Sequence, residues 1–159
     1  MKFTIISHAC LYVEHEDIKL LIDPWIYGSC YWRSWWNYPE PDEELISKIN
    51  PTHIYLTHLH WDHYHGPSLR KYYKNHPTII IPLSSTQRMK KDLDKFFLFK
   101  KIIEIPHSKS LNLSKNFKVT SYQWNPLIID SCLAVEADNK TILNVNAVSY
   151  THLRAHETA

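Results

Sequence analysis

The chain has 159 residues, 44% of them hydrophobic, and a formal net charge of +2, which suits one domain with a core of its own. No apolar run approaches the roughly 18 residues of a membrane-spanning helix, the start lacks a signal-peptide pattern, and no basic run indicates nucleic-acid binding. Three irregularly spaced cysteines, Cys10, Cys30 and Cys132, predict no disulfide framework. We therefore expect a cytoplasmic protein with no integral membrane segment and no nucleic-acid partner.

Hydrophobic periodicity predicts an alternation of strands and helices along the chain. Strands are expected at 3–7, 10–14, 18–22, 53–57, 78–82, 101–105, 117–123, 132–137 and 141–145. Helices are expected at 42–49, 67–75 and 84–97, the last with a capping-type start at Ser84. Asp138-Asn139 indicates a hairpin turn before the final strand. This alternation predicts an α/β fold.

The segment from Trp25 to Pro41 is rich in aromatic residues and has neither a helical nor a strand period. Two interpretations stay open: the aromatic side chains line a substrate wall or lid over a cleft, or they pack as a hydrophobic plug over the edge of a sheet. Arg33, within this segment, either anchors an anionic group or is an ordinary surface residue.

The run from Thr57 to Gly66, which reads THLHWDHYHG, concentrates the side chains that bind divalent metals. On an extended segment His58 and His60 point the same way, so both can contact one ion. Asp62 and His63 project differently once the chain turns, and they are expected to serve a second ion. The alternatives are a solvated histidine-rich loop or a structural metal clip, although a structural zinc site in a reducing compartment more often recruits cysteine.

The position of this run in the chain favours a functional site over a purely structural role. It follows an apolar segment expected to be a buried strand and precedes a helix that begins near Pro67, and open α/β sheets bind ligands at such strand ends. His65 is a candidate for an acid–base role beside the metal ligands. His8 and His107 each read more readily as hydrogen-bonded structural residues than as ligands.

The His58–His63 run resembles the signature of the metallo-β-lactamase superfamily, and Asp23 matches the Asp that supports its metal loop. The segments His8-Ala9 and Asp23-Pro24-Trp25 resemble those of the branch that contains the hydrolase-like domain of CMP-N-acetylneuraminate hydroxylase. The resemblance implies part of a four-layer αββα sandwich over residues 1–146, which binds two divalent ions, Zn²⁺ before Fe or Mn²⁺.

The same resemblance implies hydrolysis of a small-molecule ester, amide or phosphoester by a metal-activated water. The metal ligands would be His58, His60, Asp62 and His63, with Asp62 also orienting the nucleophile. The alternative is a non-hydrolytic metalloprotein or a domain associated with an iron oxidoreductase.

Three departures from the family pattern stand out. Gln123 is the nearest polar candidate where the first metal often has a third His, and Ala147 stands where the family carries an Asp that bridges both metals. Residues 148–158 resemble the translation of a transposase adapter used in sequencing libraries, so 147–159 is expected to be a non-native tail, with His152 and His156 not ligands. We therefore expect a truncated domain that is inactive alone.

Overall fold

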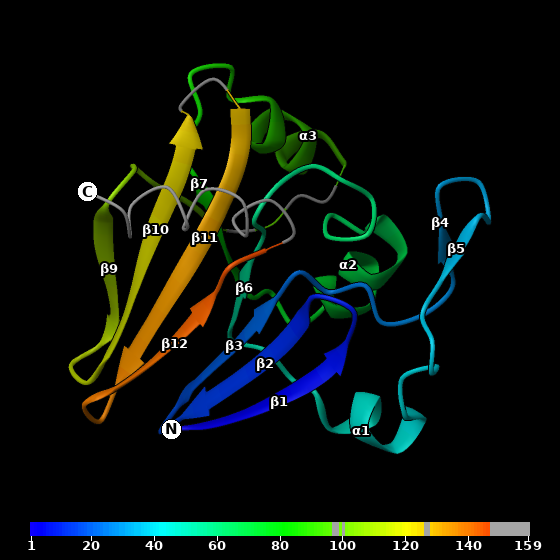
Figure 1. Ribbon diagram of the computed structural model, residues 1–159, viewed down its shortest axis with the longest axis horizontal. Coiled ribbons are helices and arrows are strands. Elements are labelled where there is room, and N and C mark those ends of the chain that lie inside the picture. The colour runs from blue at the N-terminus through cyan, green and yellow to red at the C-terminus, as the bar shows by residue number, and fades with distance from the viewer. Residues whose placement is uncertain (97–98, 100, 126–127, 147–159) are drawn as a thin grey trace, which may run out of the picture.

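The computed structural model describes residues 1–96, 99, 101–125 and 128–146, and the expectations for Ala147 and for the tail 147–159 fall outside these residues. The largest sheet has the strand order β1-β2-β3-β6-β7-β8 (Figure 1). Its strands are β1 (Lys2–Ser7), β2 (Cys10–His15), β3 (Ile18–Ile22), β6 (His53–Tyr55), β7 (Thr78–Pro82) and β8 (Ile102–Ile105). Within it β1, β2 and β3 pair antiparallel, whereas β3, β6, β7 and β8 run parallel.

A second sheet has the order β12-β11-β10-β9, and a short ribbon pairs β4 with β5. Their strands are β9 (Lys109–Ser114), β10 (Phe117–Asn125), β11 (Ile128–Ala137), β12 (Lys140–Asn144), β4 (Ser29–Cys30) and β5 (Trp35–Trp36). The helices are α1 (Glu43–Lys48), α2 (Gly66–Tyr73) and α3 (Arg88–Phe96). The chain is therefore α/β, as its alternating pattern predicts.

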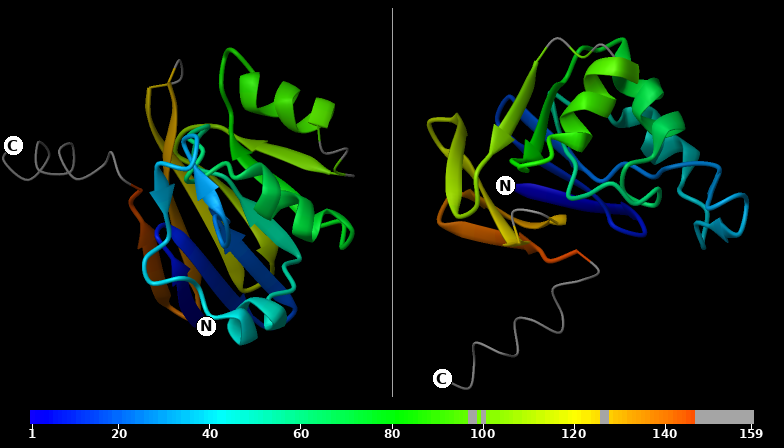
Figure 2. Two further views of the ribbon diagram at one scale, coloured as in Figure 1. Left: turned by 90° about the vertical axis from the view of Figure 1, so that its right-hand side faces the viewer. Right: turned by 90° about the horizontal axis from the view of Figure 1, so that it is seen from above.

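Two hydrophobic clusters show how the layers stack. One cluster joins the six-stranded sheet to the helices, through Ile54 and Ile79 on strands and Leu69 and Leu93 on helices. The other joins the two sheets, and Leu133 is one of its fully buried members. Figure 2 shows the same order of helices, six-stranded sheet and four-stranded sheet. The described residues thus form three layers, consistent with a partial αββα sandwich.

The parallel strands determine which edge of the sheet can carry a functional site. Because β3, β6 and β7 run in one direction, their carboxyl ends meet at one edge of the sheet. The histidine-rich run leaves the sheet at that edge, directly after β6, and α2 begins at its end (Figure 1). The run therefore lies at the end of a strand, as the sequence predicts.

Several boundaries differ from expectation for local reasons. α3 begins at Arg88 because Gln87 has a left-handed φ of 50°, and the Ser84 hydroxyl contacts Thr86 in the preceding turn instead of capping the helix. β6 ends at Tyr55, and the Thr57 amide beyond it donates to a side chain and not to a neighbouring strand.

Three strands, β4, β5 and β9, have no counterpart among the expected elements. Strands β4 and β5 have only two residues each, and β9 is polar, with no buried residue along its length. The expected turn at Asp138-Asn139 is confirmed, since both residues have positive φ between β11 and β12. Among the described residues, no helix is both long enough and apolar enough to cross a membrane.

Two leucines of the four-stranded sheet test the inter-sheet core. Leu133 is fully buried between the sheets, whereas Leu143 is 49% exposed. Replacing Leu133 with Ala should lower the free energy of unfolding by about 2–5 kcal/mol, because it leaves a cavity. The matched change Leu143→Ala should cost less than about 1 kcal/mol. Urea denaturation of both variants measures this, and equal costs would contradict the assignment of the core.

Candidate metal centre

A buried carboxylate, Asp23, lies beneath the histidine-rich run. It follows β3 directly, is fully buried and has a left-handed φ of 45°. Its oxygens accept hydrogen bonds from the amide of Thr57 at 2.8 Å and from the Thr57 hydroxyl at 2.7 Å. Nδ1 of His63 donates to the same carboxylate at 2.8 Å. Asp23 therefore supports the loop in the way that the family resemblance implies.

His58 and His60 turn their rings toward each other. Nε2 of His58 lies 2.8 Å from Nδ1 of His60, with the ring planes 77° apart. Nδ1 of His58, on the far side of its ring, lies 2.9 Å from the Thr57 hydroxyl, which fixes the ring's orientation. Two ring nitrogens that face each other can bind one ion, so the structure brings this expected pair together.

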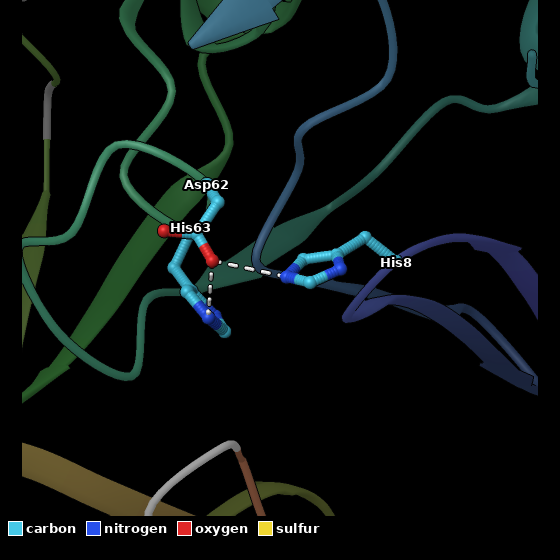
Figure 3. A group of neighbouring side chains, drawn as sticks. All are labelled: His8, Asp62 and His63. Carbon is cyan, nitrogen blue, oxygen red and sulfur yellow. Dashed lines mark hydrogen bonds and ion pairs between the residues drawn. The ribbon is translucent and has the colours of Figure 1, made fainter. Parts of the chain in front are cut away.

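Asp62 and His63 form the second expected pair, and His8 joins them from the turn between β1 and β2. Oδ2 of Asp62 lies 3.3 Å from Nε2 of His63 and 3.0 Å from Nε2 of His8. Figure 3 shows dashed lines that join this oxygen to both rings. The three ligand atoms all lie within 4.8 Å of one another. The sequence interpretation of His8 as a structural residue did not anticipate this position.

The protonation equilibria of these side chains differ sharply. Burial, followed by the nearby His63 charge, lowers the pKa of His58 to about 4. Burial also disfavours the His63 cation, but the carboxylates of Asp23 and Asp62 outweigh it and raise the pKa of His63 to about 9. Although burial would raise the pKa of Asp62, hydrogen bonding and the His63 charge hold it well below its usual value. The site is thus a neutral His58 beside a charged Asp62–His63 pair.

Some residues of the aromatic segment pack as a plug, and others line a cavity as a wall. Trp25 is almost fully buried, and its ring lies edge-on to His8 at 5.4 Å, as a plug would. Tyr31, Trp32 and Trp35 instead line a cavity of about 690 Å³ together with the His and Asp side chains, as a wall would. The Tyr31 hydroxyl donates to Oδ1 of Asp62 at 2.7 Å, so the wall is joined to the site.

Several candidates do not reach this cavity. His65 lines an adjacent cavity of about 380 Å³ with Arg33, and Nδ1 of His65 contacts the Ser68 hydroxyl at 2.8 Å. A catalytic role for His65 stays a prediction that its position does not support. The Gln123 amide donates to the carbonyls of Leu83 and Ile105, so Gln123 is not placed as a third metal ligand.

Two further residues lie near the site, Asp130 in β11 and Asn146 just beyond the end of β12. Asp130 of β11 is partly buried, and the charges of His60 and His63 act on its carboxyl group, although burial raises its pKa overall. The Asn146 amide donates to Asp130 at 2.6 Å and lies 3.2 Å from Nδ1 of His58. Sequence reasoning missed Asp130, because nothing in its local pattern distinguishes it from other strand residues.

The donor set fits a divalent metal. Imidazole nitrogens and a carboxylate suit Zn²⁺, Fe and Mn²⁺. Within the described part of the chain, Nε2 of His63 is buried and makes no hydrogen bond, although a carboxylate oxygen lies nearby. Once Nε2 has lost its proton, its buried lone pair needs a partner, and a bound cation would supply one.

Comparison with known sequences gives a consistent picture. The β-lactamase superfamily domain matches residues 2–157. An inactive cytidine monophosphate-N-acetylneuraminic acid hydroxylase of Homo sapiens is 33% identical over 89 residues, which cover 55% of this chain and 18% of that protein. The cytidine monophosphate-N-acetylneuraminic acid hydroxylase of Cricetulus griseus is 28% identical over 149 residues, covering 91% of this chain and 26% of its own length.

Two solved structures with a similar fold are enzymes of different kinds. CmlA, a diiron beta-hydroxylase from Streptomyces venezuelae, superimposes with a TM-score of 0.69 at 15% identity, over 98% of this chain and 32% of its own. An isothiocyanate hydrolase from Delia radicum gut bacteria superimposes with a TM-score of 0.64 at 18% identity, over 90% of this chain and 61% of its own. At these identities the likeness concerns the fold.

Removal of the Asp23 carboxylate should destabilise the chain strongly. In Asp23→Ala the buried groups of Thr57 and His63 lose their acceptor, which should lower the free energy of unfolding by about 3–5 kcal/mol. The control Asp94→Ala removes an exposed carboxylate paired with Lys90 and should cost about 1 kcal/mol or less. Urea unfolding with a chelator present measures both, and a cost at Asp23 no larger than that of the control would contradict its supporting role.

Metal binding should release a proton from His63. With a pKa of about 9, His63 is protonated at neutral pH in the metal-free chain, and Nε2 must lose its proton before it can bind a cation. Affinity for Co²⁺ should therefore rise about tenfold per pH unit between about pH 6.5 and pH 8.5. Titration calorimetry in buffers of different ionisation enthalpy should detect about one proton released at this position. An affinity that does not change over this range would contradict the assignment of His63.

Proposed function

This chain belongs to the β-lactamase superfamily, and from that premise we propose that it is a metal-dependent hydrolase. Its substrate would be a small molecule with an ester, amide or phosphoester bond. The chain spans about a quarter or less of the length of the curated relatives described above, so the proposal concerns the chemistry of this domain.

One observation carries the proposal: two pairs of residues with metal-binding side chains line the same cavity. His58 and His60 form one pair, Asp62 and His63 form the other, and all four come from a single loop that Asp23 supports from below. Two such pairs in one cavity suit a dinuclear site, in which zinc is the ion that we expect first.

Bound divalent ions would supply a polarising charge and lower the pKa of a water molecule toward neutrality. The chain's own residues prepare the site for this. Asp23 accepts a hydrogen bond from Nδ1 of His63, which leaves Nε2, the ring atom beside Asp62, to bind an ion. Tyr31 occupies Oδ1 of Asp62, so Oδ2 is the carboxylate atom directed at the neighbouring rings. Asp62 is therefore the residue that we assign to orienting the nucleophile.

The aromatic wall supports a substrate with an apolar part. Trp32 is 85% exposed and Trp35 is 51% exposed, and both border the cavity beside the proposed metal ligands. Trp61 stacks with Tyr31 at 5.6 Å and meets Trp32 edge-on at 4.9 Å, which gives the wall a continuous aromatic surface. An apolar or flat group beside the scissile bond would bury this surface from water.

A second function is favoured by a separate observation. The sequence relatives are hydroxylases by name, and CmlA, which has a similar fold, is a diiron beta-hydroxylase. The same imidazole and carboxylate donors also suit iron. The alternative is thus a non-hydrolytic metalloprotein, or a domain that acts with an iron oxidoreductase.

Metal content and hydrolysis can be measured together. The chain is loaded separately with Zn²⁺, Mn²⁺ or Fe²⁺, dialysed, analysed for metal and assayed against esters, amides and phosphoesters. We expect the ion at His58 and His60 to be retained weakly, because the resemblance places Ala147 where the family carries a bridging Asp, and any hydrolysis to be slow and to depend on metal. His60→Ala should reduce metal affinity or activity about 10–100-fold.

The matched control is His53→Ala, which removes a histidine at the opposite end of β6 and should leave metal retention unchanged. Two tightly held ions that His60→Ala does not affect would contradict the ligand assignment. Oxygen consumption by the iron-loaded chain, without hydrolysis of any substrate, would favour the second function over the first.

A further inference from the structure

His8 is the side chain at this centre that neither the sequence motif nor the proposed ligand pairs include. It lies in the tight turn between β1 and β2, far in sequence from the histidine-rich run, and it has a left-handed φ of 30°. This turn carries its ring to Asp62, where Nε2 of His8 lies 3.0 Å from Oδ2. The ring points into the site between the sheet edge and the loop (Figure 3).

The surroundings of His8 hold the ring in this place. Its ring centroid is 5.4 Å from that of Trp25 and 5.7 Å from that of His63, both in edge-to-face contact. The imidazole is still partly exposed and borders the same cavity as the other ligands. A histidine that only packed against the turn would have no reason to place Nε2 beside the Asp62 carboxylate.

The two oxygens of Asp62 have different partners. Oδ1 accepts the Tyr31 hydroxyl at 2.7 Å, whereas Oδ2 has Nε2 of His8 at 3.0 Å and Nε2 of His63 at 3.3 Å. Three donor atoms of the types that bind zinc therefore converge on one point, and they come from two separate segments of the chain.

We infer that His8 is the third protein ligand of the ion held by Asp62 and His63. This inference rests on the proposed function, because it concerns the second of the two metal positions proposed above. Three protein ligands that leave a fourth position open are the pattern of catalytic zinc sites, as opposed to closed structural sites. With His8 included, this position has a complete set of protein ligands within the first 63 residues. Retention of this ion then does not depend on a carboxylate at position 147.

The competing interpretation is that His8 only donates a hydrogen bond to Asp62 and so orients it. A metal ligand and a hydrogen-bond donor can be distinguished by the residues that can replace His8. An asparagine tolerates a left-handed φ and can donate to a carboxylate, but it is a poor zinc ligand. A glycine also tolerates this backbone, and it leaves space in which free imidazole can take the place of the ring.

Cobalt binding to the full chain separates these roles. Wild type, His8→Asn and His8→Gly are titrated with Co²⁺ while the visible absorption of the bound ion is recorded. We expect both variants to bind the second Co²⁺ about 10–100-fold more weakly, as loss of a ligand or of its partner typically does. The absorption of that ion should change in both variants, and added imidazole should restore it in His8→Gly.

His76→Gly is the matched control, since His76 is an exposed histidine that also has a positive φ but lies outside the site. It should titrate like wild type, with or without imidazole. Wild-type titration of the second ion by His8→Asn would overturn the inference, as would a loss in His8→Gly that imidazole does not restore. Both outcomes leave the proposed function intact. Failure of the proposed function is distinct, because the wild-type chain itself would then take up no Co²⁺.

Discussion

The buried carboxylate of Asp23 is the constraint on which the metal site depends. It lies where β3 ends, and its partners Thr57 and His63 lie in the loop that follows the neighbouring parallel strand. Because no water can take the place of these partners at a fully buried carboxylate, the loop must bring them to Asp23. The position of Thr57 and the direction of the His63 ring follow from this requirement.

The second sheet holds the same loop from the other side. The Tyr55 hydroxyl contacts the hydroxyls of Ser121 and Ser131 at 2.9 Å and 2.8 Å, and the Ser131 hydroxyl also donates to the carbonyl of Thr57 at 3.0 Å. These buried bonds join the end of β6 to β10 and β11 across the sheet interface. A polar link inside an apolar layer fixes how the sheets align, because any shift would leave buried hydroxyl groups unsatisfied. The site is thus built on rigid elements on both of its sides.

Local patterns were enough to predict the α/β class, most of the strands and the pairing of His58 with His60, because each depends on neighbours in the sequence. Contacts that depend on the folded chain were not predicted. His8 reaches Asp62 across 54 positions, and Tyr31 does so across 31, so no spacing rule relates them. The family resemblance makes Gln123 the nearest polar candidate for the third ligand of the first metal, but its amide group donates hydrogen bonds to the carbonyls of Leu83 and Ile105 instead. The left-handed Gln87 that delays α3 likewise has no signal in its residue type.

We propose that this loop holds two divalent ions in one cavity. The most direct test is a crystal of the chain soaked in Co²⁺, with anomalous diffraction collected on both sides of the cobalt edge. We expect two anomalous peaks, one contacted by Nε2 of His58 and Nδ1 of His60, the other by Asp62 and Nε2 of His63. Peaks confined to surface histidines, with none in the cavity beneath Tyr31 and Trp35, would contradict it.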